Sequence, residues 1–267
     1  MESEMQCTRC SRDQFTKAGR DRQQRQLYQC SACGCRITAR SGSAFSGYRF
    51  PDDLIALAIR WYLRYRLSYA EVAEWLAERG VSVAPSTIYD WVRAFTQCFI
   101  DAARAHHSPV GKRWRVDETY LKIGKRWHYL YRAIDEHGHI VDVYLSNRRN
   151  AAAAQAFFEG AIDASGVTPT QVTTDEAKCY PLALHTVLPR VEHRSSKYLN
   201  HCLERDHQHL KGRVRPMRHF KTVDGASTFC RGHTLIRNLG RGFSTLTAEV
   251  APRLRLATAW TALAACL

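Results

Sequence analysis

Three acidic residues occupy positions where they could act together in chemistry. Asp117 lies within "WRVDETYLKIGKRWHYLYRAID" (114–135), an apolar, β-branched and aromatic stretch that predicts strands. Asp175 ends the short strand pattern "QVTTD", and Glu204 lies in the helical stretch "LNHCLERDHQHLKGR". A single acid of this kind is more often a satisfied edge or turn residue, so the hypothesis depends on all three together.

If the fold brings these three carboxylates to one edge of a sheet, they repel one another unless cations lie between them. Oxygen ligands of this type predict two Mg²⁺ or Mn²⁺ ions per active site. Such a pair, about 4 Å apart, activates water or a 3′-hydroxyl and stabilises the leaving oxygen of a phosphodiester. Glu118 should point to the opposite sheet face, as a solvent-facing or hydrogen-bonded supporting residue. The predicted chemistry is in-line attack at phosphorus, without a covalent protein intermediate and without ATP.

The elements that must position these acids follow from the apolar pattern. Three successive strands are predicted between residues 113 and 149, and the short turns between them require antiparallel neighbours. An Ala-rich helix is expected at about 150–163, and "QVTTD" then returns as a strand beside the first. This order predicts an α/β ribonuclease-H-like core, a mixed sheet flanked by helices.

The N-terminal region carries a second candidate site. Cys7-x-x-Cys10 and Cys30-x-x-Cys33 are separated by nineteen residues, a spacing typical of four thiolates around one structural Zn²⁺. So short a segment has little apolar mass, and a metal would supply the missing folding free energy. Cys35 is an alternative to Cys33, and incidental free thiols are the simpler alternative to a metal site.

Residues 67–95, "LSYAEVAEWLAERGVSVAPSTIYDWVRAF", predict two short helices joined by a turn in which Gly80 ends the first helix. The arrangement is typical of a helix-turn-helix, or of an ordinary helical hairpin. The positive charge and the neighbouring cysteine module favour DNA binding. The expected apolar faces consist of Leu67, Val72, Trp75 and Leu76 in the first helix and Ile88, Trp91 and Val92 in the second. The residues expected to face DNA are Ser86, Thr87, Tyr89, Asp90 and Arg93.

Composition supports a nucleic-acid partner. The chain of 267 residues has 39 Lys and Arg against 25 Asp and Glu, a formal net charge of +14. An excess of this size points to a polyanion, although a merely soluble cationic protein has the same signature. No apolar stretch reaches the roughly 20 residues of a membrane span, and no export signal is visible, so a reducing cytoplasm is expected.

Several motifs together resemble the insertion-sequence-six family of bacterial transposases. The resemblance runs from about residue 50 to 243 and includes the helix-turn-helix stretch. Its other motifs are "VDETYLKIGKRWHYLYRAID", "VDVYLSNRRN", "TTDEAKCY", "VEHRSSKYLNHCLERDHQHLKGR" and "FKTVDGASTF".

The resemblance implies a catalytic D-D-E triad of Asp117, Asp175 and Glu204, followed seven residues later by a basic partner, Lys211. It also implies binding to terminal inverted repeats in double-stranded DNA, cleavage of the strand ends and their joining to target DNA. Joining two ends needs at least two active sites, so a homodimer or larger assembly on DNA at the nucleoid is expected. The interval from Asp175 to Glu204 is shorter than usual for the family, and the cysteine module is an addition to its shortest members.

Four regions are predicted: a zinc ribbon at 1–47, a helix-turn-helix domain at 48–108, a catalytic core at 109–215 and a C-terminal helical region at 216–267. Arg148, Arg149 and Arg213 form either a solvated basic surface or phosphate contacts. The histidines at 193, 201, 207 and 209 fit no standard metal cluster and are interpreted as phosphate contacts or packing. The rivals are a non-catalytic DNA-binding regulator or inactive remnant, and a nuclease that cuts without joining.

Overall fold

The computed structural model describes residues 5–196 and 201–267. The chain forms two compact units, one up to Ile55 together with Leu267 and one from Ala56 to Cys266. Among the described residues, no helix is both long enough and apolar enough to cross a membrane.

The first unit is built on a small antiparallel sheet in the order β1-β2-β3. Its strands are β1 (Phe15–Arg20), β2 (Gln26–Cys30) and β3 (Arg36–Ile37). Asp21 fixes the turn between the first two strands, since its carboxylate accepts hydrogen bonds from the backbone N–H groups of Gln23 and Arg25. The apolar side chains buried in the described part of this unit are few: Cys7, Cys30, Ile37, Phe45 and Ile55.

The two helices of the expected helix-turn-helix are present as α2 (Tyr69–Ala77) and α3 (Pro85–Arg104), after α1 (Asp52–Arg64). Ser68 and Glu71 form a capping box that starts α2. Gly80 follows its end with φ of +77°, a conformation that favours glycine.

The inward-facing residues of this helix pair were mostly predicted well. Ile88, Trp91 and Val92 are buried in α3, and Val72 and Leu76 are buried in α2. The prediction for Trp75 is wrong, because it is 36% exposed on the surface of α2. Its ring packs edge-on against Trp61 of α1, with the ring centroids 5.6 Å apart.

The large sheet has the order β6-β5-β4-β7-β8. Strands β4 (Arg113–Ile123), β5 (Arg126–Ile134) and β6 (Ile140–Ser146) form the predicted antiparallel meander. Strand β7 (Gln171–Thr174) then pairs in parallel with β4, which confirms the predicted ribonuclease-H-like order. The sequence did not predict β8 (Glu192–Ser195), which adds a further parallel edge strand.

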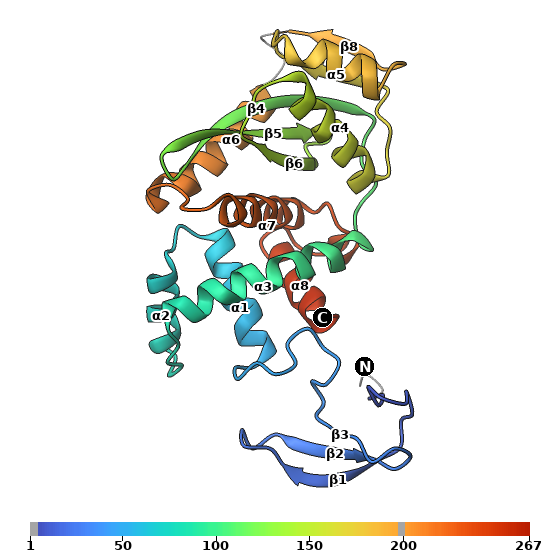
Figure 1. The fold of residues 1–267 in the computed structure, drawn as a ribbon, viewed down its shortest axis with the longest axis vertical. Helices are drawn as coiled ribbons and strands as arrows, with labels where there is room; N and C mark the ends of the chain where they lie inside the picture. Colours follow the sequence, from blue (N-terminus) through green and yellow to red (C-terminus); the bar gives the residue numbers. More distant parts are fainter. Residues whose placement is uncertain (1–4, 197–200) are drawn as a thin grey trace. The chain divides into compact units, whose positions relative to one another are not determined.

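Helices cover both faces of this sheet. On one face, α4 (Ala151–Ser165) and α5 (Cys179–Val187) bury Phe157, Phe158 and Tyr180 against Val116 and Tyr131. On the other face lie α6 (His201–Val214) and α7 (Val223–Arg241), and there Arg132 of β5 pairs with Asp206 of α6. Figure 1 shows α7 between the sheet and α3, with α8 (Arg255–Ala265) alongside.

Candidate active site

The strand register brings two of the predicted acids side by side. Strands β4 and β7 pair in parallel as far as Arg115 and Thr173. Continuing that register by two residues places Asp117 opposite Asp175, where β7 has ended. Two carboxylates therefore meet at the point where the chain leaves the sheet, and their backbones are fixed by the strands before them.

A third acid joins this pair, and it is Glu118. Ligand oxygens of Asp117, Glu118 and Asp175 lie within 4.8 Å of one another. The pKa of Asp117 is raised to about 7, first by burial and then by the negative charges of Glu118 and Asp175. The cluster thus has more negative charge than its surroundings tolerate at neutral pH.

Glu118 is a buried supporting residue. It is 7% exposed, so the solvent-facing alternative is wrong and the hydrogen-bonded alternative is confirmed. The Tyr180 hydroxyl donates a hydrogen bond to one of its carboxylate oxygens, and the Arg149 guanidinium pairs with the other. These contacts fix the Glu118 side chain between α5 and the loop that follows β6.

Arg149 lies in the acid cluster itself. Besides its ion pair with Glu118, its Nη2 donates to the Asp175 carboxylate at 3.4 Å. This guanidinium is therefore a cation placed among the acids, a location that the sequence did not predict for a residue expected to touch DNA. The neighbouring Arg148 is exposed; its backbone N–H donates to Ser146 Oγ at 3.1 Å, and its backbone oxygen accepts from the Tyr131 hydroxyl at 3.5 Å.

Glu204 is not brought into the cluster. It is exposed on α6 and is absent from the acid groups that gather within 4.8 Å in the described part of the chain. The helix itself does reach the site, because His207 Nδ1 lies 3.8 Å from Asp117 Oδ2. Glu204 precedes His207 by three residues and so lies on the same side of the helix, about 5–6 Å away between Cβ atoms. Lys211 is half-buried on the same helix.

A buried ion network holds α6 against the sheet. Asp206 pairs with Arg132 of β5, and both side chains are completely buried. Its other oxygen lies 3.2 Å from Arg237 and 2.6 Å from Arg241, both on α7. Three arginines around it lower the pKa of Asp206 to about 2 despite its burial, which acts in the opposite direction.

The sequence contained a signal for this network that the prediction missed. The buried residues of α6 include Leu203, Asp206, His207 and Leu210. Their positions follow the i, i+3, i+4, i+7 spacing of an inward helix face. The apolar pattern thus ran through Asp206 and His207. Burial lowers the pKa of His207 to about 3, so the imidazole beside Asp117 is neutral. A packing role for His207 is in line with this burial, and His201 has a side chain outside the described residues.

The acid cluster has the donor chemistry that Mg²⁺ and Mn²⁺ require. Its ligand atoms are carboxylate oxygens, which these hard cations prefer. Three acids face one guanidinium, and a divalent ion would relieve the repulsion that raises the pKa of Asp117.

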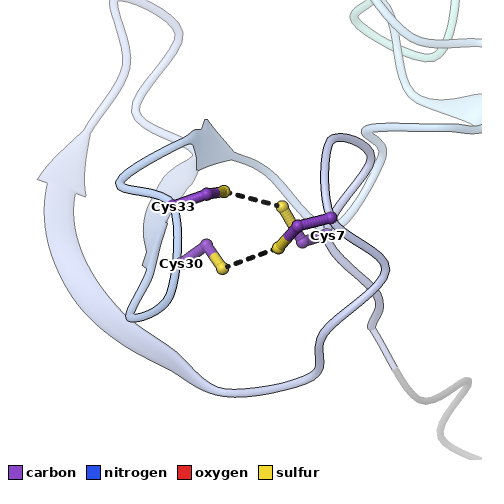
Figure 2. Close-up of side chains that lie close together, drawn as sticks. Cys7, Cys30 and Cys33 are labelled. Atoms are coloured by element: carbon purple, nitrogen blue, oxygen red, sulfur yellow. Dashed lines mark hydrogen bonds between the residues drawn. The ribbon is translucent and has the colours of Figure 1, made fainter.

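The four predicted zinc ligands also lie together, within the first unit. The Sγ atoms of Cys7, Cys10, Cys30 and Cys33 lie within 4.8 Å of one another. The Cys7–Cys33 and Cys10–Cys30 sulfur pairs are each 3.5 Å apart, too far for a disulfide. Tetrahedral Zn²⁺ with bonds of about 2.3 Å separates its sulfurs by about 3.8 Å, so the group fits zinc. Figure 2 shows Cys30 and Cys33 facing Cys7.

Backbone N–H groups lower the pKa of Cys7 and Cys30, whereas burial and the neighbouring thiols raise the pKa of Cys10 and Cys33. The N–H of Arg9, with a smaller contribution from that of Cys10, lowers the pKa of the Cys7 thiol to about 6. Cys35 is not part of the gathered group, so the geometry favours Cys33 between the two alternatives.

The predicted DNA-facing residues of α3 lie on its outer side. Ser86 and Arg93 are exposed, and Thr87 and Tyr89 are half-buried. Arg93 donates to the Tyr89 hydroxyl at 3.3 Å, which links these two side chains on the helix surface.

Arg213 was predicted to contact DNA, and this is wrong. It is 4% exposed, and it donates to the backbone oxygens of Tyr62 and Leu67. Its guanidinium also lies 5.2 Å from the Phe229 ring centroid. The residue joins α6 to the helical part of the unit, where DNA has no access.

A ribonuclease-H-like sheet that presents paired acids where β4 and β7 part defines a class of phosphoryl-transfer enzymes acting on nucleic acids. Comparison with known proteins assigns the chain to a narrower family within this class. A model described as "DDE domain" matches residues 111–243. The transposase for insertion sequence-like element IS431mec of Staphylococcus aureus is 39% identical over 189 residues, covering 69% of this chain and 83% of that protein. The transposase for IS257 in transposon Tn4003, from the same species, is 38% identical with the same coverage.

Among solved structures, the HTLV-2 integrase catalytic core domain in complex with magnesium aligns with a TM-score of 0.33 at 16% identity. The alignment covers 58% of this chain and 85% of that one, and it adds nothing to the assignment. The chain belongs to the insertion-sequence-six family of DDE transposases. It is a DNA transposase, an enzyme of DNA strand cleavage and strand transfer.

Proposed function

We propose that Asp117, Asp175 and Glu204 hold two Mg²⁺ or Mn²⁺ ions, with which the enzyme cuts terminal inverted repeats and joins their 3′ ends to target DNA. The observation that carries this proposal is the convergence of Asp117 and Asp175 at the end of β7, with the pKa of Asp117 raised to about 7. When bound, the ions would activate the attacking water or 3′-hydroxyl and stabilise the leaving oxygen.

Each residue has a distinct task in this proposal. Asp117 and Asp175 supply ligand oxygens from fixed backbone positions on the sheet. Glu204 supplies the third carboxylate once its side chain approaches Asp117. Helix α6 already reaches Asp117 through His207. Lys211 contacts a DNA phosphate near the bond that breaks.

Glu118 and Arg149 shape the site from the opposite sheet face. Glu118 is held by Tyr180 and so has a fixed position beside the ligand acids. Arg149 balances part of their charge, and it must release Asp175 before a divalent ion can take the same oxygen. It is then free to pair with a DNA phosphate, in line with the DNA contact predicted for it.

DNA recognition in this proposal uses the outer face of α3, through Ser86, Thr87, Tyr89 and Arg93. The Cys₄ group binds structural Zn²⁺ and helps to recognise the DNA ends. Two ends must be joined, so the active form is a homodimer or larger assembly on DNA, in the cytoplasm at the bacterial nucleoid.

The test is a strand-transfer assay with Mg²⁺ and DNA copied from the ends of the element. Wild type should give joined product, and Asp175→Ala and Glu204→Gln should each lower the rate by at least about 1000-fold, the order expected for losing metal-held charge stabilisation. Glu159→Gln, which changes an exposed acid of α4, is the matched control and should not affect the rate.

The same assay separates the alternatives. If Glu118→Gln abolishes joining while Glu204→Gln does not, Glu118 is the third ligand and the assignment of Glu204 fails. If wild type binds the ends but neither cuts nor joins them, the chain is an inactive remnant that acts as a regulator. Nicked DNA without joined product would identify a nuclease.

A further inference from the structure

A cluster of aromatic residues on the β4–β5 hairpin has no role in the chemistry above. We call it the hairpin patch: Tyr120 and Lys122 of β4 with Trp127 and Tyr129 of β5. Tyr120 lies directly across from Tyr129, and Lys122 lies across from Trp127. The ring centroids of Tyr120 and Tyr129 are 5.2 Å apart, and those of Tyr120 and Trp127 are 6.4 Å apart.

Two large aromatic rings of the hairpin patch are exposed, while Lys122 and Tyr129 are half-buried. Tyr120 is 48% exposed and Trp127 is 58% exposed, whereas Leu121, Ile123 and Leu130 on the opposite face of the hairpin are buried. Figure 1 shows the hairpin extending beyond α4, which covers the same sheet face nearer to the core. Ring contacts across the strands stabilise the hairpin, but they do not require Trp127 to be 58% exposed, and a contiguous exposed aromatic surface marks an interaction site.

The hairpin patch begins next to the acid cluster. Glu118 and Tyr120 are two residues apart on β4, so they share the sheet face opposite to that of Asp117, at a separation of about 7 Å. A ligand oxygen of Glu118 lies within 4.8 Å of those of Asp117 and Asp175, so the acid cluster reaches this face as well. Nucleotides in a stacked DNA strand are about 3.4 Å apart, so this separation corresponds to about two nucleotides. Strand β7 pairs with β4 only as far as Arg115, so a DNA strand held with its phosphodiester at the acids can pass this edge of β4 and place its next nucleotides over the patch.

The surroundings of the hairpin patch favour a polyanion over another protein surface. Lys122 Nζ lies 6.0 Å from the Trp127 ring centroid, and Lys125 and Arg126 are exposed at the adjoining turn. Residues 119–134 contain four Lys and Arg residues, one histidine (His128) and no acid. Flat rings among cations match the two parts of a nucleotide, since the rings stack on a base and the cations attract its phosphate.

We propose that the hairpin patch stacks an unpaired base of the DNA end close to the bond that reacts. This inference rests on the proposed function, because it places the reacting phosphodiester at Asp117 and Asp175. The patch supplies affinity for an opened end that a fully paired duplex cannot use, because paired bases hide their faces in the helix stack. Opening of the end thereby becomes a step that the enzyme favours before cleavage.

The experiment compares the Kd for blunt DNA ends with that for ends whose last three base pairs are mismatched. It uses the full zinc-loaded chain with Asp175→Ala, so that no reaction occurs. Trp127→Ala or Tyr120→Ala should weaken binding to mismatched ends by about 5- to 150-fold, the loss typical of one base stack, and leave blunt ends nearly unchanged. Trp127→Phe and Tyr120→Phe should keep the preference.

Tyr65→Ala is the matched control, since Tyr65 is also 48% exposed but directly follows α1. Photo-crosslinking of 5-iodouracil placed in the mismatched segment should label Trp127 or Tyr120. Equal losses on blunt and mismatched ends, no loss on either, or a change of oligomeric state with an unchanged Kd ratio would overturn the proposal. Binding is measured without catalysis, so failure of strand transfer by the wild type would count against the proposed function alone.

Discussion

Neutralising Asp206 should destabilise the second unit more than any exposed charge change. In Asp206→Asn the completely buried Arg132 loses its partner, as do Arg237 and Arg241. Breaking a buried ion pair on one side typically costs about 3–5 kcal/mol, because the remaining charge stays buried without compensation. Asp101→Asn is the control, since it removes an exposed pair with Arg104 at 3.6 Å and should cost less than about 1 kcal/mol.

The direction in which stability changes with pH follows from Asp206 and from the buried histidines. The folded pKa of Asp206 is about 2 and its ordinary value is 3.8, so its contribution is complete above pH 3.8 and is lost as pH falls toward 2. Burial lowers the pKa of His207 and His233 from 6.5 to about 3 and that of His139 to about 4. These three histidines outnumber Asp117 and Asp142, whose pKa values burial raises to about 7 and about 6 and which act in the opposite direction. The unfolded chain therefore binds protons at these histidines first, and stability should fall from pH 6.5 downward, before Asp206 titrates.

Urea unfolding followed by tryptophan emission measures these effects selectively, because all six tryptophans lie in the second unit. Asp206→Leu combined with Arg132→Met should recover much of the lost stability, since an apolar pair of similar volume often replaces a buried ion pair at little cost. A loss below about 1 kcal/mol in Asp206→Asn would refute the reasoning, and so would stability that is constant from pH 6.5 to 4.

Further outcomes follow from the two candidate metal sites and the buried arginine. Cys10→Ser should lower bound zinc from one equivalent to a weakly held fraction, measured by chelator titration, and should unfold the first unit. Arg149→Ala should tighten Mn²⁺ binding by roughly 3- to 10-fold, as measured by calorimetry, because a competing cation is removed from the acids, whereas Arg148→Ala should not. Mn²⁺ affinity should rise with pH until about 7 and then level off, since Asp117 must lose its proton to bind a cation; a flat profile would contradict this. Arg213→Ala should cost about 2 kcal/mol in urea unfolding and leave the salt dependence of DNA binding unchanged.

The strand order and the two paired acids were predictable because they depend on local patterns. Alternating apolar residues and short turns fix an antiparallel meander, and a strand after a helix must return in parallel. The strand order alone brings Asp117 and Asp175 together, independently of how the helices pack. The cysteine pairs were predictable for a related reason, since each knuckle is a local turn.

Charged residues inside the protein were the least predictable part. Arg132, Asp206 and Arg213 are buried because partners from distant segments neutralise or solvate them, and sequence spacing does not show which partner arrives. Glu118 and Arg149 illustrate the same point at the active site, since the sequence did not predict that this acid and this base would pair beside Asp175. Helical spacing did place Asp206 inward, but its charge concealed that signal.

The position of α6 decides whether the acids form one site. Asp117 lies directly across from Arg132 in the β4–β5 register, and Arg132 holds Asp206 of α6. The sheet position that presents Asp117 thus also anchors α6. This helix carries Glu204, two residues before Asp206. Glu204 is exposed beside this anchor, so its approach requires a change of side chain or a small movement of the helix end, with the anchor in place. In the proposed mechanism the anchor fixes α6 while Glu204 stays exposed, so a divalent ion and DNA together would bring its carboxylate to the site, and the repulsion at Asp117 favours that step.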